Sequence, residues 1–426
     1  MNALDFLYVP LAILSSPWWA RKKREGWDER SGKIESMLSE RWTSDTSTDH
    51  SKHTQDSKPV ILLHAVSVGE VNALRALVPL LVDDSTVVIS TTTDTGLARA
   101  QSIFSSTCEV VRYPLDCSWM VKRFFNTINP QVVGLVELEV WPNFVRECTI
   151  RKIPVGLING RLSARSFKGY RKARFFIGPT FKRLSFACMQ DSAYAARVSD
   201  MGAPSVQVTG TMKWDAVQIS DTQISDTPEG SEPSVGAIAI VNEMGLDLSK
   251  PIVVAGSTGP GEESLLRSSC PDGVQLVCAP RKPDRFEEAA AALEGCVRRS
   301  SGAAGASDCY LLDTIGELSL LYEIADVVVI GRSFFDLHGS DPLEAAALGK
   351  PVLIGPEHSD FTTQIEALRA VSGIQIVERA QLGAAIKSLI AEPIRGLEMG
   401  QNARRCVIEH QGASEVHAQE LLKFVK

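Results

Sequence analysis

Acidic side chains next to short polar turns are the groups in this sequence best suited to chemistry. Glu70 ends the stretch HAVSVGE, residues 64–70, which follows an apolar run at residues 60–63. A carboxylate at a turn between a strand and a helix can take a proton from an incoming hydroxyl group. A structural role is the alternative, because Ser67 and Glu70 have the spacing of a helix capping box. Spacing alone favours the cap, so the neighbouring sequence must decide.

A second pair of carboxylates follows another apolar run in the first half of the chain. Glu137 and Glu139 come directly after residues 132–136. In an extended continuation of that strand, both side chains would point to the same side. Two carboxylates placed together are costly unless they are paired or exposed. Arg161 and Lys213 are candidate partners, although a lone lysine is usually an ordinary surface residue.

Polar residues also follow the predicted strands of the second half. Ser257 and Thr258 open a glycine-containing turn after the run at residues 252–255, and such a turn suits a phosphate group. Arg281 and Lys282 follow the next strand. A guanidinium at a strand end can capture a phosphate or carboxylate through two hydrogen bonds.

Two further acidic motifs share the ambiguity of Glu70. Residues 314–317 (TIGE) and 341–344 (DPLE) have capping-box spacing, with Glu317 and Glu344 at the third helical position. Each glutamate could therefore simply cap its own helix. All of them nevertheless lie at predicted carboxyl ends of parallel strands, where ligands bind, which favours ligand contact.

A basic segment spans residues 161–183 and contains no acidic residue. Phe175 and Phe176 are among the aromatic residues interleaved with its charges. In an acidic protein, such a segment suggests an anionic partner, such as a phosphorylated lipid or the membrane surface. No RNA-binding motif accompanies it. Its basic residues are Arg161, Arg165, Lys168, Arg171, Lys172, Arg174, Lys182 and Arg183.

Composition excludes several other classes of protein. The net charge of −7 argues against a general nucleic-acid binder. Nine cysteines without a Cys-x-x-Cys pair indicate reduced thiols in the cytosol rather than a zinc site or a disulfide framework. Because the sequence also lacks Asp-x-Asp, we expect no bound metal, with phosphate held by arginine, lysine and helix dipoles.

Short apolar strands alternate with helical patterns in two halves, which predicts two doubly wound parallel sheets with a ligand cleft between their carboxyl ends. We expect an N-terminal domain at 59–216, a linker at 217–245, a second domain at 246–410 and a closing helix at 411–426. The predicted helices of the first half are 71–81, 96–105, 118–128 and 193–201. The predicted strands are 60–64, 86–90, 108–113, 132–136, 155–158, 186–189 and 206–209, then 252–255, 275–279, 310–312, 327–330 and 352–354.

The first residues predict attachment to a membrane. Residues 1–26 combine a largely apolar stretch with a tryptophan pair and a flank of four basic residues. The stretch is marginal as a membrane span, but its basic flank would stay on the cytoplasmic side. We interpret it as a short anchor, followed by a polar linker at residues 27–58. The alternative is a helix packed on the protein's own core.

Seven motifs in collinear order resemble those of the 3-deoxy-D-manno-octulosonic acid (Kdo) transferases of lipid A and lipopolysaccharide assembly. The resemblance covers nearly everything from residue 60 to residue 410, and seven motifs in order are far more specific than any one alone. The motifs are HAVSVGE (64–70), TTTDTG (91–96), ELEVWPN (137–143), NGRLS (159–163), PRKPDRF (280–286), GEL (316–318) and DPLE (341–344).

This resemblance implies an inverting glycosyltransferase of the GT-B fold at the cytoplasmic face of the inner membrane. Its donor would be CMP-Kdo, its acceptor a phosphorylated glucosamine disaccharide, and it would need no cofactor. By match to the family motifs, Glu70 is the general base, and Glu139 (or Glu137) and Lys213 stabilise the transition state. Ser67, Ser257, Thr258 and Glu137 are possible phosphate or sugar contacts. The basic residues Arg161, Arg165, Lys168, Arg171 and Lys172 would face the acceptor, and Arg281, Lys282, Ile315, Gly316, Glu317, Asp341, Pro342, Leu343 and Glu344 would hold the donor.

Two departures from the family pattern concern the donor. Lys282 stands where the family usually has histidine, and Ser340-Asp341 where it has His-Asn. Aspartate keeps an acceptor oxygen but loses the amide donor and adds a negative charge. The alternatives are another GT-B transferase or epimerase that uses a UDP-sugar, and a non-catalytic protein that binds anionic lipid.

Overall fold

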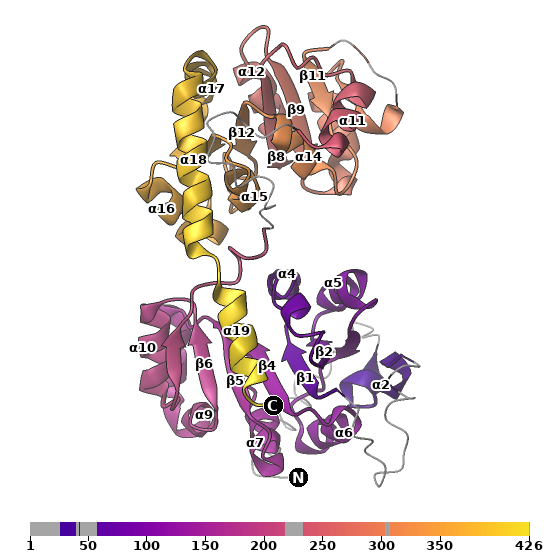
Figure 1. The fold of residues 1–426 in the computed structure, drawn as a ribbon, viewed down its shortest axis with the longest axis vertical. Helices are drawn as coiled ribbons and strands as arrows, with labels where there is room; N and C mark the ends of the chain where they lie inside the picture. The colour runs from indigo at the N-terminus through magenta and orange to yellow at the C-terminus, as the bar shows by residue number, and fades with distance from the viewer. Residues whose placement is uncertain are drawn as a thin grey trace. The chain divides into compact units, whose positions relative to one another are not determined.

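The computed structural model describes residues 26–39, 42, 58–217, 233–302, 305 and 307–425. Two units divide the chain (Figure 1): the first runs to Ala216 and includes Gln411 onward, and the second is Val217–His410. The predicted anchor at residues 1–26 lies almost entirely outside the described residues, as does much of the linker at 27–58. Among the helices of the described part, none is both long and apolar enough to cross a membrane.

The first unit is built on a seven-stranded parallel sheet with the order β3-β2-β1-β4-β5-β6-β7. The strand order reverses between β1 and β4, and the carboxyl ends of strands at such a reversal are where doubly wound sheets bind ligands. This confirms the predicted parallel sheet. The strands are β1 (Val60–His64), β2 (Thr86–Thr91), β3 (Glu109–Arg112), β4 (Val132–Val136), β5 (Val155–Gly160), β6 (Phe186–Met189) and β7 (Val206–Val208).

Helices cover both faces of this sheet because successive side chains of a buried strand point to opposite sides. Ile61 and Leu63 pack in one core cluster with residues of α4, α5 and α19, whereas Leu62 packs in a second cluster with residues of α6, α7 and α9. The closing helix α19 lies against β4 and β5 (Figure 1). The helices are α2 (Trp27–Arg30), α4 (Val68–Ala73), α5 (Asp94–Phe104), α6 (Ser118–Ile128), α7 (Pro142–Arg151), α8 (Ala164–Lys172), α9 (Arg174–Phe181), α10 (Ser192–Met201) and α19 (Ala413–Leu422).

The second unit repeats the architecture with the strand order β10-β11-β9-β8-β12-β13-β14, all parallel. Its order reverses between β8 and β12. The strands are β8 (Ile252–Thr258), β9 (Gln275–Pro280), β10 (Val297–Arg298), β11 (Cys309–Leu311), β12 (Val327–Ile330), β13 (Val352–Ile354) and β14 (Gln375–Ile376). The helices are α11 (Val235–Met244), α12 (Glu262–Ser269), α13 (Phe286–Ala292), α14 (Leu318–Ile324), α15 (Leu343–Ala347), α16 (Thr362–Ala370), α17 (Leu382–Ala391) and α18 (Pro393–His410).

Three details differ from the sequence-based expectations. The helix predicted at 71–81 ends early: α4 stops at Ala73 and a 3₁₀ turn, Val78–Leu80, contains Pro79, which cannot continue a helix. The range 217–245, expected to be linker, includes α11, which packs on α14 in the second unit. The two-residue edge strands β10 and β14 were not predicted, because so short a strand has no alternating pattern.

Candidate active site

Glu70 lies in the first turn of α4, directly after β1. Its carboxylate accepts hydrogen bonds from the Val66 N–H (2.8 Å) and the Ser67 hydroxyl (2.9 Å), and Ser67 Oγ accepts one from the Glu70 N–H at 3.4 Å. Ser67 is therefore the N-cap, as predicted, but the Glu70 carboxylate closes the box on the Val66 N–H and the Ser67 hydroxyl rather than on the N–H of the N-cap. Capping and chemistry are compatible here, because the box fixes the carboxylate at the carboxyl end of a central strand.

The environment of Glu70 prepares it to act as a base near neutral pH. The pKa of its carboxyl is raised to about 7, chiefly by burial and also by the negative charges of Glu137 and Glu139. The hydrogen bonds from Val66 and Ser67 oppose this change because they stabilise the charged form. A carboxylate with a pKa close to the working pH combines a large ionised fraction with basicity.

Glu137 and Glu139 lie on the turn that joins β4 to α7. The expectation of a strand-like continuation was wrong, because Glu137 has a left-handed backbone (φ 56°). The turn nevertheless brings both carboxylates into the electrostatic environment of Glu70. Glu139 accepts a hydrogen bond from the Trp141 indole at 2.7 Å, and burial raises its pKa. Its charge also raises the pKa of Tyr170, which places α8 beside this carboxylate.

The loop that carries Lys213 is fastened to the end of β5 and to α19. The Met212 N–H donates to Asn159 Oδ1 (3.1 Å), and the Asn159 N–H donates to His417 Nε2 (2.7 Å). Burial lowers the pKa of His417, which keeps its ring neutral and able to accept that bond. Asp215 accepts hydrogen bonds from two N–H groups at the start of α19. Lys213 itself is half-buried.

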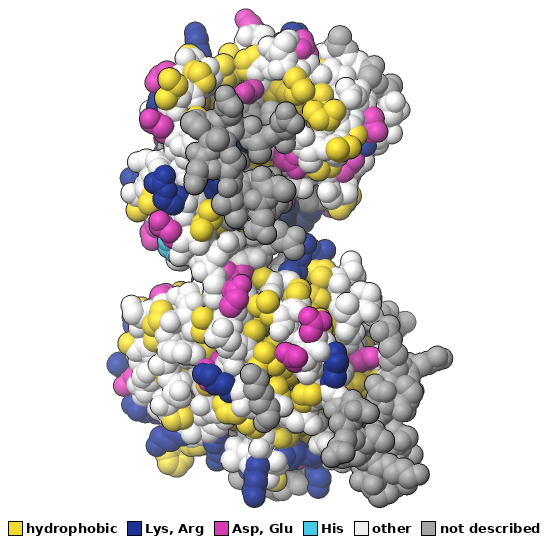
Figure 2. All heavy atoms as spheres, in the orientation of Figure 1, with side chains coloured by type: hydrophobic (Ala, Val, Ile, Leu, Met, Phe, Trp, Pro, Cys, Tyr) yellow, Lys and Arg dark blue, Asp and Glu magenta, His cyan; other side chains and the backbone are white. Residues whose placement is uncertain are grey.

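The basic segment forms α8 and α9 and the corner between them. Most of its charged side chains are exposed, and Lys and Arg side chains gather along the margin of the first unit beside α9 and α7 (Figure 2). Phe167 and Tyr170 pack against the core, while Phe175 and Phe176 are 86% and 60% exposed and contact each other edge to face. The Arg171 guanidinium lies over the Phe167 ring. The segment is therefore a cationic surface with two protruding aromatic rings.

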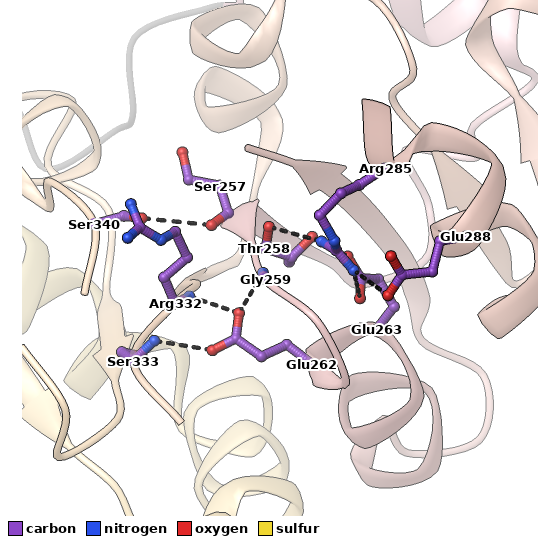
Figure 3. Close-up of polar contacts among 10 residues, drawn as sticks. All are labelled: Ser257, Thr258, Gly259, Glu262, Glu263, Arg285, Glu288, Arg332, Ser333 and Ser340. Carbon is purple, nitrogen blue, oxygen red and sulfur yellow. Dashed lines mark hydrogen bonds and ion pairs between the residues drawn. The ribbon is translucent and has the colours of Figure 1, made fainter. Parts of the chain in front are cut away.

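The strand-end turns of the second unit are held together by two buried carboxylates (Figure 3). Glu262 accepts hydrogen bonds from the N–H groups of Gly259 and of three residues after β12, at 2.5 to 3.0 Å. Glu263 pairs with Arg285 (2.9 Å) and accepts from the Thr258 hydroxyl (2.7 Å). These contacts join the ends of β8, β9 and β12, so they form a rigid support for a ligand.

Ser257, a predicted phosphate or sugar contact, and Arg281, a predicted donor-binding residue, lie at neighbouring strand ends on this support. Ser257 has a left-handed backbone (φ 57°), and its carbonyl accepts a hydrogen bond from the Ser340 hydroxyl at 3.4 Å. The Arg281 N–H donates to the Thr258 carbonyl at 3.1 Å, and the side chains of Arg281 and Lys282 are exposed. A polar, partly cationic edge of this kind suits an anionic nucleotide.

Tyr322 is buried within the electrostatic reach of Arg281 and of the two carboxylates at the start of α15. Burial raises the pKa of Tyr322, as do the charges of Glu344 and Asp341, while the charge of Arg281 opposes them. Its ring fills the space above Gly256, where a Cβ would lie 1.8 Å from the hydroxyl oxygen. Sequence reasoning missed Tyr322, because nothing in its spacing distinguishes it from a core residue.

The helix starts near Glu317 and Glu344 differ from the predicted capping boxes. Glu317 is the N-cap residue of α14, and its side chain instead forms an ion pair with Arg299 (2.9 Å), which lowers the pKa of Glu317. Pro342 is the N-cap of α15, although Asp341 Oδ1 still accepts from the Leu343 N–H at 3.0 Å. Just before Glu317, the Ile315 side chain is 72% exposed and Gly316 has a left-handed backbone (φ 95°).

Comparisons with known proteins agree on one family. Residues 25–216 match the family model of the 3-deoxy-D-manno-octulosonic-acid transferases (Kdo transferases). The chain is 30% identical to the 3-deoxy-D-manno-octulosonic acid transferase of Bordetella pertussis over 381 residues, covering 83% of this chain and 85% of that protein. It is 28% identical to the Haemophilus influenzae transferase over 385 residues, covering 86% of each.

Solved structures show the same fold at lower sequence identity. The UDP-GlcNAc 2-epimerase of Neisseria meningitidis superposes with a TM-score of 0.54, at 15% identity, over 85% of this chain and 100% of that one. Anabaena HepE in complex with UDP gives a TM-score of 0.56, at 13% identity, over 86% of this chain and 98% of that one. The two parallel-sheet units thus form the GT-B architecture that the sequence predicted.

Proposed function

The chain belongs to the Kdo transferase family, and we propose that it transfers Kdo from CMP-Kdo to a phosphorylated glucosamine disaccharide, the lipid A precursor. Membership of this family makes the chain a glycosyltransferase. Our proposal goes further and specifies the donor, the acceptor and an inverting mechanism. The observation that carries the proposal is the half-buried carboxyl of Glu70, which has a pKa of about 7 at the carboxyl end of β1.

Glu70 is the general base of the proposed reaction. Its carboxylate takes the proton of the acceptor hydroxyl as that oxygen attacks the anomeric carbon of Kdo and CMP departs. Inversion follows from this single displacement. Positive charge develops on the sugar as the bond to the phosphate breaks, so the carboxylates of Glu137 and Glu139 stabilise the transition state from nearby.

The second unit binds the donor. The turn at Ser257 and Thr258 and the exposed side chains of Arg281 and Lys282 provide hydrogen-bond donors and positive charge for the phosphate of CMP. Because the phosphate leaves with the nucleotide, cations beside it lower the barrier to bond breaking. Asp341 adds a negative charge close to this edge and therefore weakens donor binding. No metal is required in this mechanism.

The cationic surface of α8 and α9 binds the anionic acceptor and the membrane that contains it. Exposed Arg165, Lys168 and Lys172 attract phosphate groups, and the rings of Phe175 and Phe176 enter the interface between headgroups and acyl chains. We therefore propose that the enzyme works at the cytoplasmic face of the inner membrane. The proposed anchor at residues 1–26 would strengthen the attachment, since stable binding usually takes two signals.

The test is a product analysis by mass spectrometry. The purified full chain is incubated with a CMP-Kdo generating system and the disaccharide acceptor, with UDP-GlcNAc as the matched alternative donor. We expect acceptor mass to rise in Kdo-sized increments with CMP-Kdo alone, and the number of increments gives the number of sugars added. Transfer from UDP-GlcNAc, or no product despite bound CMP, would contradict the proposed donor.

A further inference from the structure

The backbone of Val66 joins Glu70 to the neighbouring strand-to-helix turn. Its N–H donates to Glu70 Oε2 at 2.8 Å, and its carbonyl accepts from the hydroxyl (2.8 Å) and the N–H (3.3 Å) of Thr93. The Val66 carbonyl packs closely against the first turn of α5, because a Cβ on Gly96 would lie 2.8 Å from the Val66 oxygen. The turn before α5 therefore determines where the N–H that holds Glu70 can lie.

Two buried arginines hold that turn in place. Arg30 donates to the Thr92 carbonyl at 3.0 Å and to Asp94 Oδ1 at 3.2 Å, and Arg112 donates to the same oxygen of Asp94 at 2.5 Å. Arg30 and Arg112 are only 5% and 8% exposed, whereas the Asp94 side chain is 66% exposed. The hydrogen bond from Arg112 lowers the pKa of Asp94, so this carboxylate stays charged. A buried guanidinium that lost such a partner would be costly, which favours this one arrangement.

The segment that carries Arg30 is closely packed against the rest of the first unit. Gly26 and Gly32 bracket it at φ 78° and 86°. A Cβ on Gly26 would lie 2.5 Å from Arg112 Nε, and one on Gly32 would lie 2.3 Å from a backbone oxygen of α6. The Arg30 carbonyl also accepts from the Leu115 N–H at 2.9 Å. The segment just after residue 25 is thus built onto the carboxyl edge of β2 and β3.

We propose that Arg30 and Asp94 are positioning residues for Glu70, acting through Thr92–Thr93 and Val66. Neither residue touches the reacting groups. The inference rests on the proposed role of Glu70 as base, and it adds that the chain segment preceding the first sheet adjusts that base. A shift of the segment at Arg30 can thereby affect catalysis through the hydrogen bonds of Thr92–Thr93 and Val66.

The effect on Glu70 has a definite sign. The Val66 N–H stabilises the ionised carboxylate, so a looser Val66 raises the pKa of Glu70. Arg30, Arg112 and Asp94 form a clamp at the carboxyl ends of β2 and β3. Glu137 and Glu139, the other titratable groups that act on Glu70, follow β4, on the opposite side of β1 from β2. A role confined to stability would lower the amount of folded enzyme without moving the pH profile.

The experiment compares Asp94→Asn and Arg30→Lys with Asp200→Asn in the full-length enzyme. Asparagine keeps an oxygen that Arg30 and Arg112 can bind, so Asp94→Asn removes the charge but not the acceptor, and circular dichroism verifies that the variant is folded. Arg30→Lys keeps the charge but loses the forked geometry. Asp200 pairs with Arg174 in the same unit and has no part in the clamp. For both clamp variants we expect kcat to fall about tenfold with the acceptor KM unchanged, and the acid limb of kcat/KM to move upward by about half a pH unit.

Amide hydrogen exchange without substrate keeps this test independent of the reaction. The peptide that contains Val66 and Glu70 should exchange faster in Asp94→Asn than in the parent or in Asp200→Asn. Unchanged exchange and an unmoved acid limb in an enzyme that transfers Kdo would overturn the clamp. Faster exchange in a protein that transfers no Kdo would instead overturn the proposed function and leave the clamp standing.

Discussion

The pKa of Glu70 gives the most detailed prediction, because it converts a local environment into a pH profile. A carboxyl with a pKa of about 7 is about one-tenth ionised at pH 6 and about nine-tenths ionised at pH 8. If the ionised form is the base, kcat/KM rises nearly tenfold over that interval. At the ordinary glutamate pKa the side chain would already be almost fully ionised at pH 6, and the profile would be flat.

Glu137→Gln tests the cause of the shift. The negative charge of Glu137 raises the pKa of Glu70, so its removal should move the acid limb downward by about half a pH unit. Glu415→Gln is the matched control, because it removes an exposed carboxylate of α19 in the same unit. The acceptor phosphates titrate near pH 6 as well, but their contribution is common to both variants and cancels.

The assay is initial-rate Kdo transfer at subsaturating acceptor between pH 5.5 and pH 8.5, in buffers of constant ionic strength. Circular dichroism at both extremes verifies that each variant stays folded. A flat profile between pH 6 and pH 8 would show that Glu70 is not a base with a pKa of about 7, since such a base must titrate there. Identical limbs in Glu137→Gln and Glu415→Gln would refute the assigned cause.

Three further predictions concern the donor, the membrane and the fold. Asp341→Asn should lower the KM for CMP-Kdo several-fold in steady-state kinetics, because it removes a negative charge beside the phosphate site; an unchanged or higher KM would contradict this. Phe175→Ser with Phe176→Ser should reduce sedimentation with anionic vesicles about tenfold, whereas turnover of a detergent-dispersed acceptor stays constant; equal sedimentation of parent and variant would contradict it. Burial lowers the pKa of His64 to about 3, so stability is lost as pH falls below the unfolded pKa of 6.5, by about 2 kcal/mol between pH 7 and pH 5. Urea unfolding followed by tryptophan fluorescence measures this loss in the first unit, because all seven tryptophans precede residue 217, and His64→Gln should flatten the dependence.

Sequence patterns predicted the architecture well because both sheets are parallel and buried. Strands such as β1 and β4 are continuous apolar runs ended by polar turns, so their bounds could be predicted from the sequence alone. The edge strands of the second sheet were harder to predict, because β10 and β14 have two residues each and depend on pairing with a neighbouring strand. The turn at Glu137 was also mispredicted, because its left-handed backbone is imposed by contacts with β5 rather than by a glycine.

The candidate site was predictable to the extent that motifs stand at strand ends. Glu70 and Arg281 could be located in this way, because the carboxyl ends of parallel strands meet at one edge. The supporting groups could not be located. Glu262, Tyr322 and Arg30 act through contacts with residues distant in sequence, and their local spacing does not indicate such partners. Long-range hydrogen bonds and burial are properties of the folded chain.

Single-turnover Kdo transfer by Glu70→Gln tests the role of Glu70 as the general base most directly. Glutamine keeps the size of the side chain, and its carbonyl oxygen can accept from the Val66 N–H while its amide donates to Ser67 Oγ, so binding should survive while proton abstraction is lost. We predict a decrease in the rate of transfer of about 10² to 10⁴, with CMP and the acceptor bound as tightly as by the parent enzyme. A variant that transfers Kdo within about threefold of the parent rate would show that another group takes the proton, and would contradict the role of Glu70 as the general base.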